Sequence, residues 1–181
     1  MVKKVNWGII GLGNSANKFT QDLARSPNAA LRSVASREID KAKQFSQEYD
    51  VVSFYDSYKE LAKNPDIDIV YITTPNAFHF EHAMMCLKEG KSVLCEKPLG
   101  MNADEVKMMI KEAKSRNLFL MEGLSTRFIP STEKALSLIE KKFIGDITMV
   151  RADFGIDASS LKGNWLFDKN MGGGSLSDLG I

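Results

Sequence analysis

The chain has 181 residues, of which 44% are hydrophobic and 26% charged, an average composition for a soluble globular protein. Fibrous and intrinsically disordered classes are therefore excluded. The 24 basic and 23 acidic side chains are interspersed and give a net charge of +1, so we expect no nucleic-acid or membrane-surface partner.

No apolar run approaches the ~18 residues of a membrane helix. Glycines interrupt the first apolar stretch, so the basic start at Met1 is not interpreted as a signal peptide. Cys86 and Cys95 lack a CxxC spacing, and we expect free thiols in a reducing cytoplasm.

Short runs rich in β-branched residues alternate with helical patterns up to about residue 122, which predicts a doubly wound α/β fold with a parallel sheet. Strands are predicted at residues 5–10, 31–36, 51–54, 69–73, 92–95 and 118–121. Two stripes at helical spacing are predicted to face the core: Phe80, Ala83, Met84 and Leu87, and then Val106, Met109, Ile110 and Ala113. Asn76 and Gly90 fit the start and stop of the first helix, and Asn102 the N-cap of the second.

The pattern changes after residue 125. A helix predicted from Pro130 leads to Gly145, a strand is predicted at residues 147–154, and a glycine-rich loop with the beginning of a helix follows at 155–181. One helix, one strand and a loop cannot bury a sheet face of their own. We therefore expect a complete domain at residues 1–125 and the first part of a second domain at 126–181.

A glycine-rich turn follows the first predicted strand and opens a helix. Its G-x-G-x-x-A pattern covers Gly11, Gly13, Asn14, Ser15 and Ala16. In a strand–turn–helix context, such a turn lets backbone N–H groups approach a pyrophosphate, which predicts a Rossmann dinucleotide site. The alternative is a tight turn that needs glycine for steric reasons only.

The end of the second strand bears on which dinucleotide is bound. NAD sites usually place an acidic residue there to hold the ribose 2′-hydroxyl, whereas this chain has Ser36 and Arg37, with Lys41 one helical turn later. A hydroxyl and two cations suit a 2′-phosphate, so NADP is the preferred cofactor and NAD remains possible. The alternative is a solvated basic turn.

Two further motifs follow the fourth and fifth strands, at the edge where open α/β sheets bind ligands. They supply the remaining candidate cofactor contacts, which are Thr73, Thr74, Pro75, Asn76, His79, Glu96, Lys97 and Pro98. From the residues alone, Glu96 and Lys97 could equally form a surface ion pair. His79 and His82 are three residues apart without a nearby carboxylate ligand, so no metal site is predicted.

Together these motifs resemble the glucose-fructose oxidoreductase, inositol dehydrogenase and MocA family. The resemblance rests on the glycine turn, Thr74-Pro75-Asn76-x-x-His79, Glu96-Lys97-Pro98, the stretch around Arg127, and Gly172-Gly173-Gly174 with Asp178 and Gly180. The regions of Arg127 and Asp178 look most like the dihydrodiol dehydrogenase branch. Relatives have a second α/β domain with an open antiparallel sheet, and the resemblance implies a homo-oligomer formed through that sheet.

The resemblance also implies an activity, which is hydride transfer between NAD(P) and a secondary alcohol or hemiacetal of a sugar, polyol or dihydrodiol. Lys97 and Asp178 would be catalytic, and Lys97, Arg127, Trp165 and Asp178 would contact the substrate. The family's aromatic acid/base is expected directly after Ile181, so this chain alone is expected to bind nucleotide with little turnover. Two alternatives stay open: a regulatory NAD(P)-binding protein without turnover, and an NAD-dependent glycosidase of the same fold.

Overall fold

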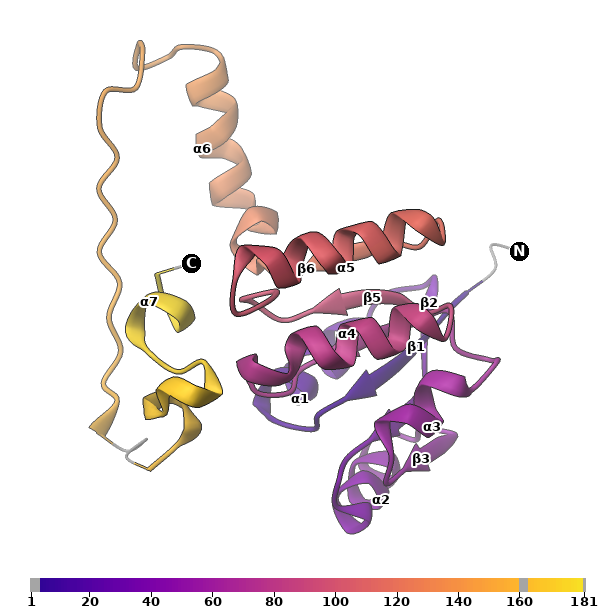
Figure 1. Cartoon of the computed structure of the whole chain (residues 1–181). Helices are drawn as coiled ribbons and strands as arrows, with labels where there is room; N and C mark the ends of the chain where they lie inside the picture. Colours follow the sequence, from indigo (N-terminus) through magenta and orange to yellow (C-terminus); the bar gives the residue numbers. More distant parts are fainter. Residues whose placement is uncertain (1–3, 160–162, 181) are drawn as a thin grey trace.

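The computed structural model describes residues 4–159 and 163–180, so the basic start at Met1 and the terminal Ile181 lie outside it. One parallel sheet has the strand order β3-β2-β1-β4-β5-β6 (Figure 1). Its strands are β1 (Val5–Ile10), β2 (Ala29–Ala35), β3 (Ser53–Tyr55), β4 (Ile69–Ile72), β5 (Ser92–Cys95) and β6 (Leu120–Glu122). The six strands predicted for the first region are confirmed, with small shifts at some ends.

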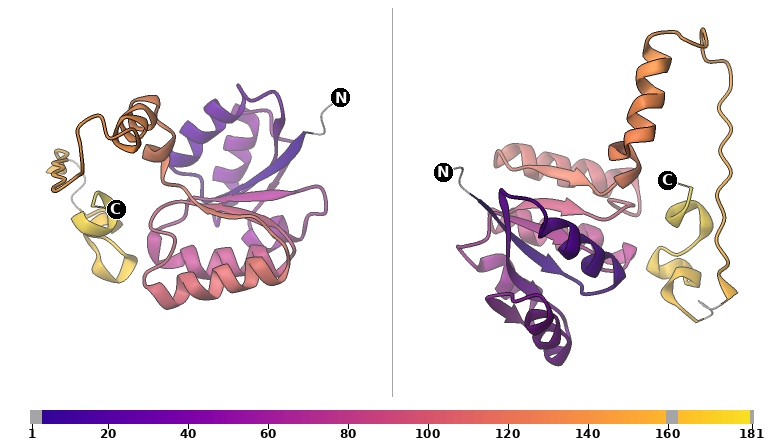
Figure 2. Two further views of the ribbon diagram at one scale, coloured as in Figure 1. Left: turned by 90° about the horizontal axis from the view of Figure 1, so that it is seen from above. Right: turned by 180° about the vertical axis from the view of Figure 1, so that it is seen from behind.

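Helices cover both faces of the sheet (Figure 2). They are α1 (Asn14–Leu23), α2 (Ile39–Glu48), α3 (Tyr58–Lys63), α4 (His79–Lys88) and α5 (Ala103–Ser115). One core joins α1 and α2 to the sheet through Ala16 and Phe45, and the other joins α3, α4 and α5 through residues such as Leu61 and Leu87. This is the predicted doubly wound Rossmann architecture.

The N-cap prediction for α5 is confirmed, because Asn102 Oδ1 accepts hydrogen bonds from the backbone N–H groups of Asp104 and Glu105 at 3.1 and 3.0 Å. The stripe prediction for this helix is only partly right. Met109 is fully buried, whereas Ile110 is 39% exposed. An amphipathic helix packed on one layer buries a limited arc, and Ile110 lies at the margin of that arc.

The second region is built differently. Helix α6 (Pro130–Glu140) stands away from the sheet, and an extended segment returns alongside it to the short helix α7 (Ser175–Asp178) (Figures 1 and 2). The strand predicted at 147–154 is wrong: the segment is extended but is not a strand. A strand needs a hydrogen-bonded neighbour, and the described residues provide none there.

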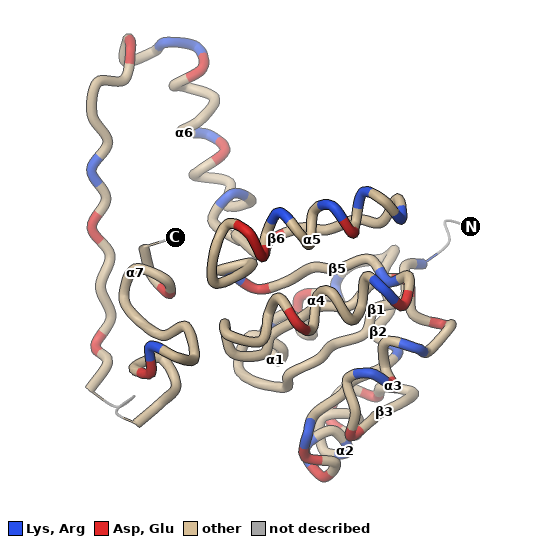
Figure 3. The backbone as a smooth tube through the Cα atoms, viewed as in Figure 1, with Lys and Arg blue, Asp and Glu red and all other residues tan. Residues whose placement is uncertain are grey.

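Basic and acidic residues are interspersed along the helices, as in α5 (Figure 3). Cys86 and Cys95 are free and buried, as predicted. Within residues 4–159 and 163–180, no helix is long and apolar enough to cross a membrane.

The sheet reverses its strand order between β1 and β4, since the chain runs from β1 outward to β3 and then returns to β4 and outward to β6. In open α/β sheets the carboxyl ends of the strands form a crevice at such a reversal. The glycine turn follows β1 directly and therefore lies at this crevice.

Candidate functional site

The glycine turn has the geometry of an anion-binding turn. Gly11 has a φ of +82°, and a Cβ there would lie 2.9 Å from the backbone at Thr73 and Thr74, so only glycine fits without strain. Thr73 Oγ1 donates to the Gly11 carbonyl oxygen at 2.5 Å and ties the turn to the end of β4.

The N-terminus of α1 starts at this turn and is open. Its N-cap, Gly13, provides no side-chain cap, the first turn carries no acidic residue, and a Cβ on Gly13 would meet nothing within 4 Å. The first N–H groups of a helix need partners and favour an anion. The predicted residues Asn14, Ser15 and Ala16 form this first turn. An open helix N-terminus of this kind is suited to an anion.

The predicted 2′-phosphate residues share a pocket with the glycine turn. This pocket of about 240 Å³ is lined by Gly11, Leu12, Gly13, Ser36, Arg37, Glu38, Lys41, Tyr58, Thr73, Thr74, Pro75 and Trp165. Ser36 is buried, and its Oγ accepts from the Glu38 backbone N–H at 3.2 Å. Burial is the main cause that raises the pKa of the Tyr58 hydroxyl, and the nearby positive charge of Arg37 opposes this increase.

His79 joins the two loops that follow β4 and β5. The imidazole is fully buried, and its Nε2 and Nδ1 lie 2.7 Å from the carbonyl oxygens of Thr74 and Pro98. A side chain with no exposed surface cannot contact a bound cofactor, so its place here is beneath the site, as a residue that positions Thr74 and Pro98.

Lys97 and Asp178 meet across the two regions of the chain. Lys97 Nζ lies 2.7 Å from Asp178 Oδ1 and also donates to the Asp178 carbonyl oxygen, and each side chain is 26% exposed. Among the described residues Lys97 pairs with Asp178 and forms no salt bridge with Glu96, so the surface pair considered from the sequence is not seen. The peptide bond between Lys97 and Pro98 is cis.

The Glu96 carboxylate bonds to other groups than the Lys97 ammonium. Its Oε1 accepts from the Tyr71 hydroxyl at 2.5 Å, and its Oε2 accepts from the Lys97 backbone N–H at 3.3 Å. Burial, followed by the negative charge of Glu96, raises the pKa of Tyr71. Both residues line a pocket of about 250 Å³ beside α1, together with Ser15.

Asp178 also borders a larger, mostly apolar pocket of about 600 Å³. Its lining includes Phe154, Ile156, Leu166, Phe167 and Leu179. Lys97 follows β5 by two residues and reaches the border of this pocket through its contact with Asp178 Oδ1.

Two predicted residues have unexpected neighbours, and a third is exposed. Asn76 is buried and donates from Nδ2 to the Gly172 carbonyl oxygen at 2.9 Å, so it links the two regions of the chain. Trp165, predicted to contact substrate, lines the pocket beside the glycine turn and not the apolar one. Arg127 is exposed and makes no ion pair or side-chain hydrogen bond within the described part of the chain.

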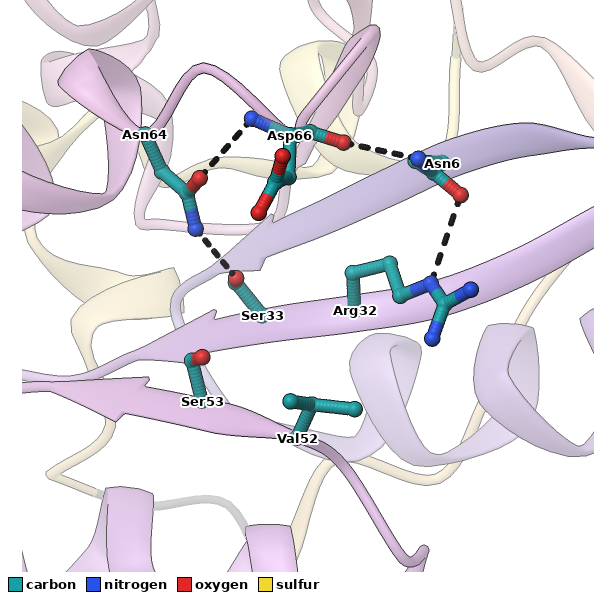
Figure 4. Close-up of a pocket in the computed structure, with 7 residues that line it drawn as sticks. All are labelled: Asn6, Arg32, Ser33, Val52, Ser53, Asn64 and Asp66. Carbon is teal, nitrogen blue, oxygen red and sulfur yellow. Dashed lines mark hydrogen bonds between the residues drawn. The ribbon is translucent and has the colours of Figure 1, made fainter.

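A separate pocket of about 320 Å³ lies toward the amino ends of β1, β2 and β3, away from the glycine turn (Figure 4). Its polar groups are tied to one another: Asn64 donates to Ser33 Oγ at 3.2 Å and accepts from the Asp66 backbone N–H at 2.9 Å, and Asn6 donates to the Asp66 carbonyl oxygen at 2.8 Å. These bonds fasten β1 and β2 to the loop before β4, and we assign the pocket no part in the site.

Two residues of the crevice were not predicted from the sequence. Tyr58 lines the pocket beside the glycine turn, and His82 places its Nδ1 2.9 Å from Thr74 Oγ1. Tyr58 follows the third strand after the helix cap Ser57, so the rule that sites form at the carboxyl ends of strands could have found it. His82 lies one helical turn inside α4 and gave no comparable signal.

The chain matches two protein-family profiles. Residues 5–124 match the family described as "Oxidoreductase family, NAD-binding Rossmann fold", and residues 132–181 match the "GFO/IDH/MocA C-terminal domain". Among curated proteins, trans-1,2-dihydrobenzene-1,2-diol dehydrogenase of Macaca fuscata fuscata is 42% identical over 180 residues, which are 98% of this chain and 53% of that protein. The mouse enzyme of the same name is 40% identical over 179 residues, with 98% and 53% covered.

Solved structures agree. An NAD-binding protein from Listeria innocua superposes with a TM-score of 0.82 at 27% identity, covering 98% of this chain and 52% of that one. A scyllo-inositol dehydrogenase from Lactobacillus casei gives 0.76 at 28%, with 81% and 44% covered. A 3-ketoreductase from Actinomadura kijaniata, solved with NADP, gives 0.75 at 28%, with 80% and 46% covered.

The chain thus spans about half the length of the curated relatives that it matches. The profile for the Rossmann part covers most of the chain, and the motifs on which the resemblance rests lie together at one edge of the sheet. The chain therefore belongs to the Gfo/Idh/MocA oxidoreductase family.

Proposed function

We propose that this chain is the nucleotide-binding part of an NADP-preferring oxidoreductase that transfers hydride to or from a secondary alcohol or hemiacetal of a sugar, polyol or dihydrodiol. The observation that carries the proposal is the contact of 2.7 Å between Lys97 Nζ and Asp178 Oδ1 at the carboxyl edge of the sheet. It joins a cation beside the nucleotide crevice to a carboxylate that borders a pocket large enough for a cyclic substrate.

The residues of the crevice fit a dinucleotide. The open N-terminus of α1 would hold the pyrophosphate, and Ser36, Arg37 and Lys41 would hold a 2′-phosphate. When bound, the nicotinamide ring accepts or donates the hydride. The Actinomadura relative, solved with NADP, supports this preference.

In this proposal Lys97 donates a hydrogen bond to the substrate oxygen, and its positive charge stabilises the alkoxide that develops as hydride leaves. Asp178 orients the ammonium group of Lys97. Glu96 positions the backbone of Lys97, at the start of the loop after β5, by accepting a hydrogen bond from the Lys97 N–H. His79 and Asn76 position the loops, and Thr73, Thr74, Pro75 and Pro98 shape the wall around the cofactor. Arg127 and Trp165 remain candidates for contacts with substrate or cofactor.

The domain division at residue 125 is part of the proposal, with 126–181 as the start of a second domain whose open antiparallel sheet would mediate a homo-oligomer. Support comes from the two profile matches, which end and begin on either side of that point. The two buried free thiols support a cytoplasmic location.

The cofactor assignment is tested by calorimetric titration of the chain with NADP⁺ and with NAD⁺, repeated on Arg37→Ala. A charge-assisted hydrogen bond contributes about 1.5–3 kcal/mol, so we expect Arg37→Ala to weaken NADP⁺ binding by at least about tenfold and NAD⁺ binding by much less. Arg25→Ala is the matched control, because Arg25 is an exposed arginine that pairs with Asp22 away from the pocket.

Tighter binding of NAD⁺ than of NADP⁺ would contradict the preference and would favour the glycosidase alternative. Hydride transfer is tested separately in the complete natural protein, by NADPH formation from dihydrodiols, xylose and inositol. Substitution of Lys97 by Met should abolish that formation while nucleotide binding remains. Nucleotide binding without any turnover would support the regulatory alternative.

A further inference from the structure

A second pocket adjoins the nucleotide pocket. It has a volume of about 170 Å³, and Arg37, Tyr58 and Thr74 line both pockets. Its remaining wall includes Glu81 and His82 of α4. A phosphate held by Arg37 would therefore lie next to this pocket as well as inside the first one.

His82 is held firmly in that wall. Its Nδ1 lies 2.9 Å from Thr74 Oγ1, and its ring meets the Tyr58 ring edge-on, with centroids 4.9 Å apart. Phe78 stacks on the ring at 5.9 Å. The Thr74 hydroxyl can donate or accept, so this contact survives either protonation state of the imidazole.

Charged and titratable groups face His82 from three elements: Arg37 from the turn before α2, Tyr58 from α3, and Glu81 and His79 from α4 itself. Burial is the main cause that lowers the pKa of His82 below its ordinary value of 6.5. Arg37 and His79 add to this lowering, and Glu81 opposes it. Without nucleotide, His82 is therefore neutral near neutral pH.

We propose that His82 is a specificity-determining residue that takes up a proton from solvent when a dinucleotide with a 2′-phosphate binds beside Arg37. The inference rests on the proposed function, because it requires that phosphate. The phosphate adds negative charge and offsets the positive charge of Arg37, which lowers the His82 pKa, so the bound nucleotide favours the protonated imidazole. Because linkage is reciprocal, protonated His82 in turn strengthens the binding of NADP⁺. NAD⁺ carries no phosphate there, so selectivity for NADP⁺ rises as the pH falls.

Calorimetry in two buffers of different ionisation enthalpy gives the number of protons taken up per nucleotide bound. We compare the unmodified chain with His82→Gln, which is uncharged and can still hydrogen-bond Thr74. With NADP⁺ the unmodified chain should take up more protons than the variant, and with NAD⁺ the two should agree. For each protein we take the ratio of its NADP⁺ affinity to its NAD⁺ affinity. The ratio of the unmodified chain, divided by the ratio of His82→Gln, should rise at least about threefold as the pH is lowered from about 8 to about 6. The division removes the effect of the titration of the 2′-phosphate itself, because that effect is common to both proteins.

Two further variants control for structure. His82→Phe keeps an aromatic ring against Tyr58 and should behave like His82→Gln, which separates loss of charge from loss of packing. Glu81→Gln removes the charge that favours protonation and should move the proton uptake to lower pH. Equal proton counts in the unmodified chain and His82→Gln, with NADP⁺ still preferred, would overturn the role of His82 alone. Preference for NAD⁺, or no binding of either nucleotide, would overturn the proposed function as well.

Discussion

Residues 4–125 and the described residues of 126–180 use their apolar side chains in opposite ways. In the first region, Leu87 and Met109 are fully buried between helices and sheet. In the second, Phe143, Met149 and Val150 are 76%, 83% and 82% exposed. An apolar pattern therefore defines structure only where another element covers it, because burial against a partner is the source of the stabilisation.

Few contacts join the two regions at the site. Lys97 pairs with Asp178, and Asn76 bonds to the carbonyl of Gly172. Gly172 packs closely there, since a Cβ on it would lie 2.6 Å from the Asn76 Cβ. The candidate site therefore combines residues of the sheet region with residues 172–178 of the second region, which are attached to it through these contacts.

The largest difference between the two regions should appear when buried and exposed side chains are truncated. Leu87→Ala should lower the free energy of unfolding by about 3 kcal/mol, because it leaves a cavity in a closed core. Val150→Ala, the matched control, should change it by less than about 0.5 kcal/mol. Urea denaturation of both variants measures this. Similar losses would mean that the extended segment is covered in solution.

The glycine turn offers the next largest effect. Gly11→Ala should cost about 2 kcal/mol, because alanine is strained at a φ of +82° and its Cβ would contact the backbone at Thr73. Gly13→Ala should leave stability within about 0.5 kcal/mol, since its Cβ meets no protein atom, and yet weaken NADP⁺ binding by filling the space for the pyrophosphate. Thermal unfolding and calorimetric titration of the pair check this. Unchanged nucleotide binding in Gly13→Ala would place the pyrophosphate elsewhere.

The attachment of the second region is tested by Asn76→Ala. Loss of this buried bond should cost about 1 kcal/mol and speed hydrogen exchange of the amides in residues 172–180. Asn102→Ala, which removes the N-cap of α5, should cost a similar amount without changing exchange there. If both variants left those amides equally protected, the bond between Asn76 and Gly172 would not be what holds the segment.

The smallest effect concerns pH. Burial lowers the pKa of His82 in the folded chain, whereas the unfolded chain keeps the ordinary value of 6.5. Above both values His82 is neutral in both states and contributes nothing. As the pH falls through 6.5 the unfolded chain gains a proton that the folded chain does not, so stability falls until the folded pKa is reached. The unmodified chain should therefore lose more stability on acidification than His82→Gln, measured by urea denaturation at several pH values. Parallel curves would show that His82 is not perturbed.

The parallel sheet, the glycine turn and the basic end of β2 could be predicted from the sequence, because these features depend on local periodicity and turn chemistry. The sequence also placed Lys97 and Asp178 among the candidates through the resemblance of their motifs. The contact between these two residues, 81 positions apart, depends on the folded chain, as do the place of His79 beneath the loops and that of Trp165 in the pocket beside the glycine turn. The strand predicted at 147–154 failed for the same physical reason: strand pairing and contacts between distant side chains depend on a partner, and no local pattern specifies that partner.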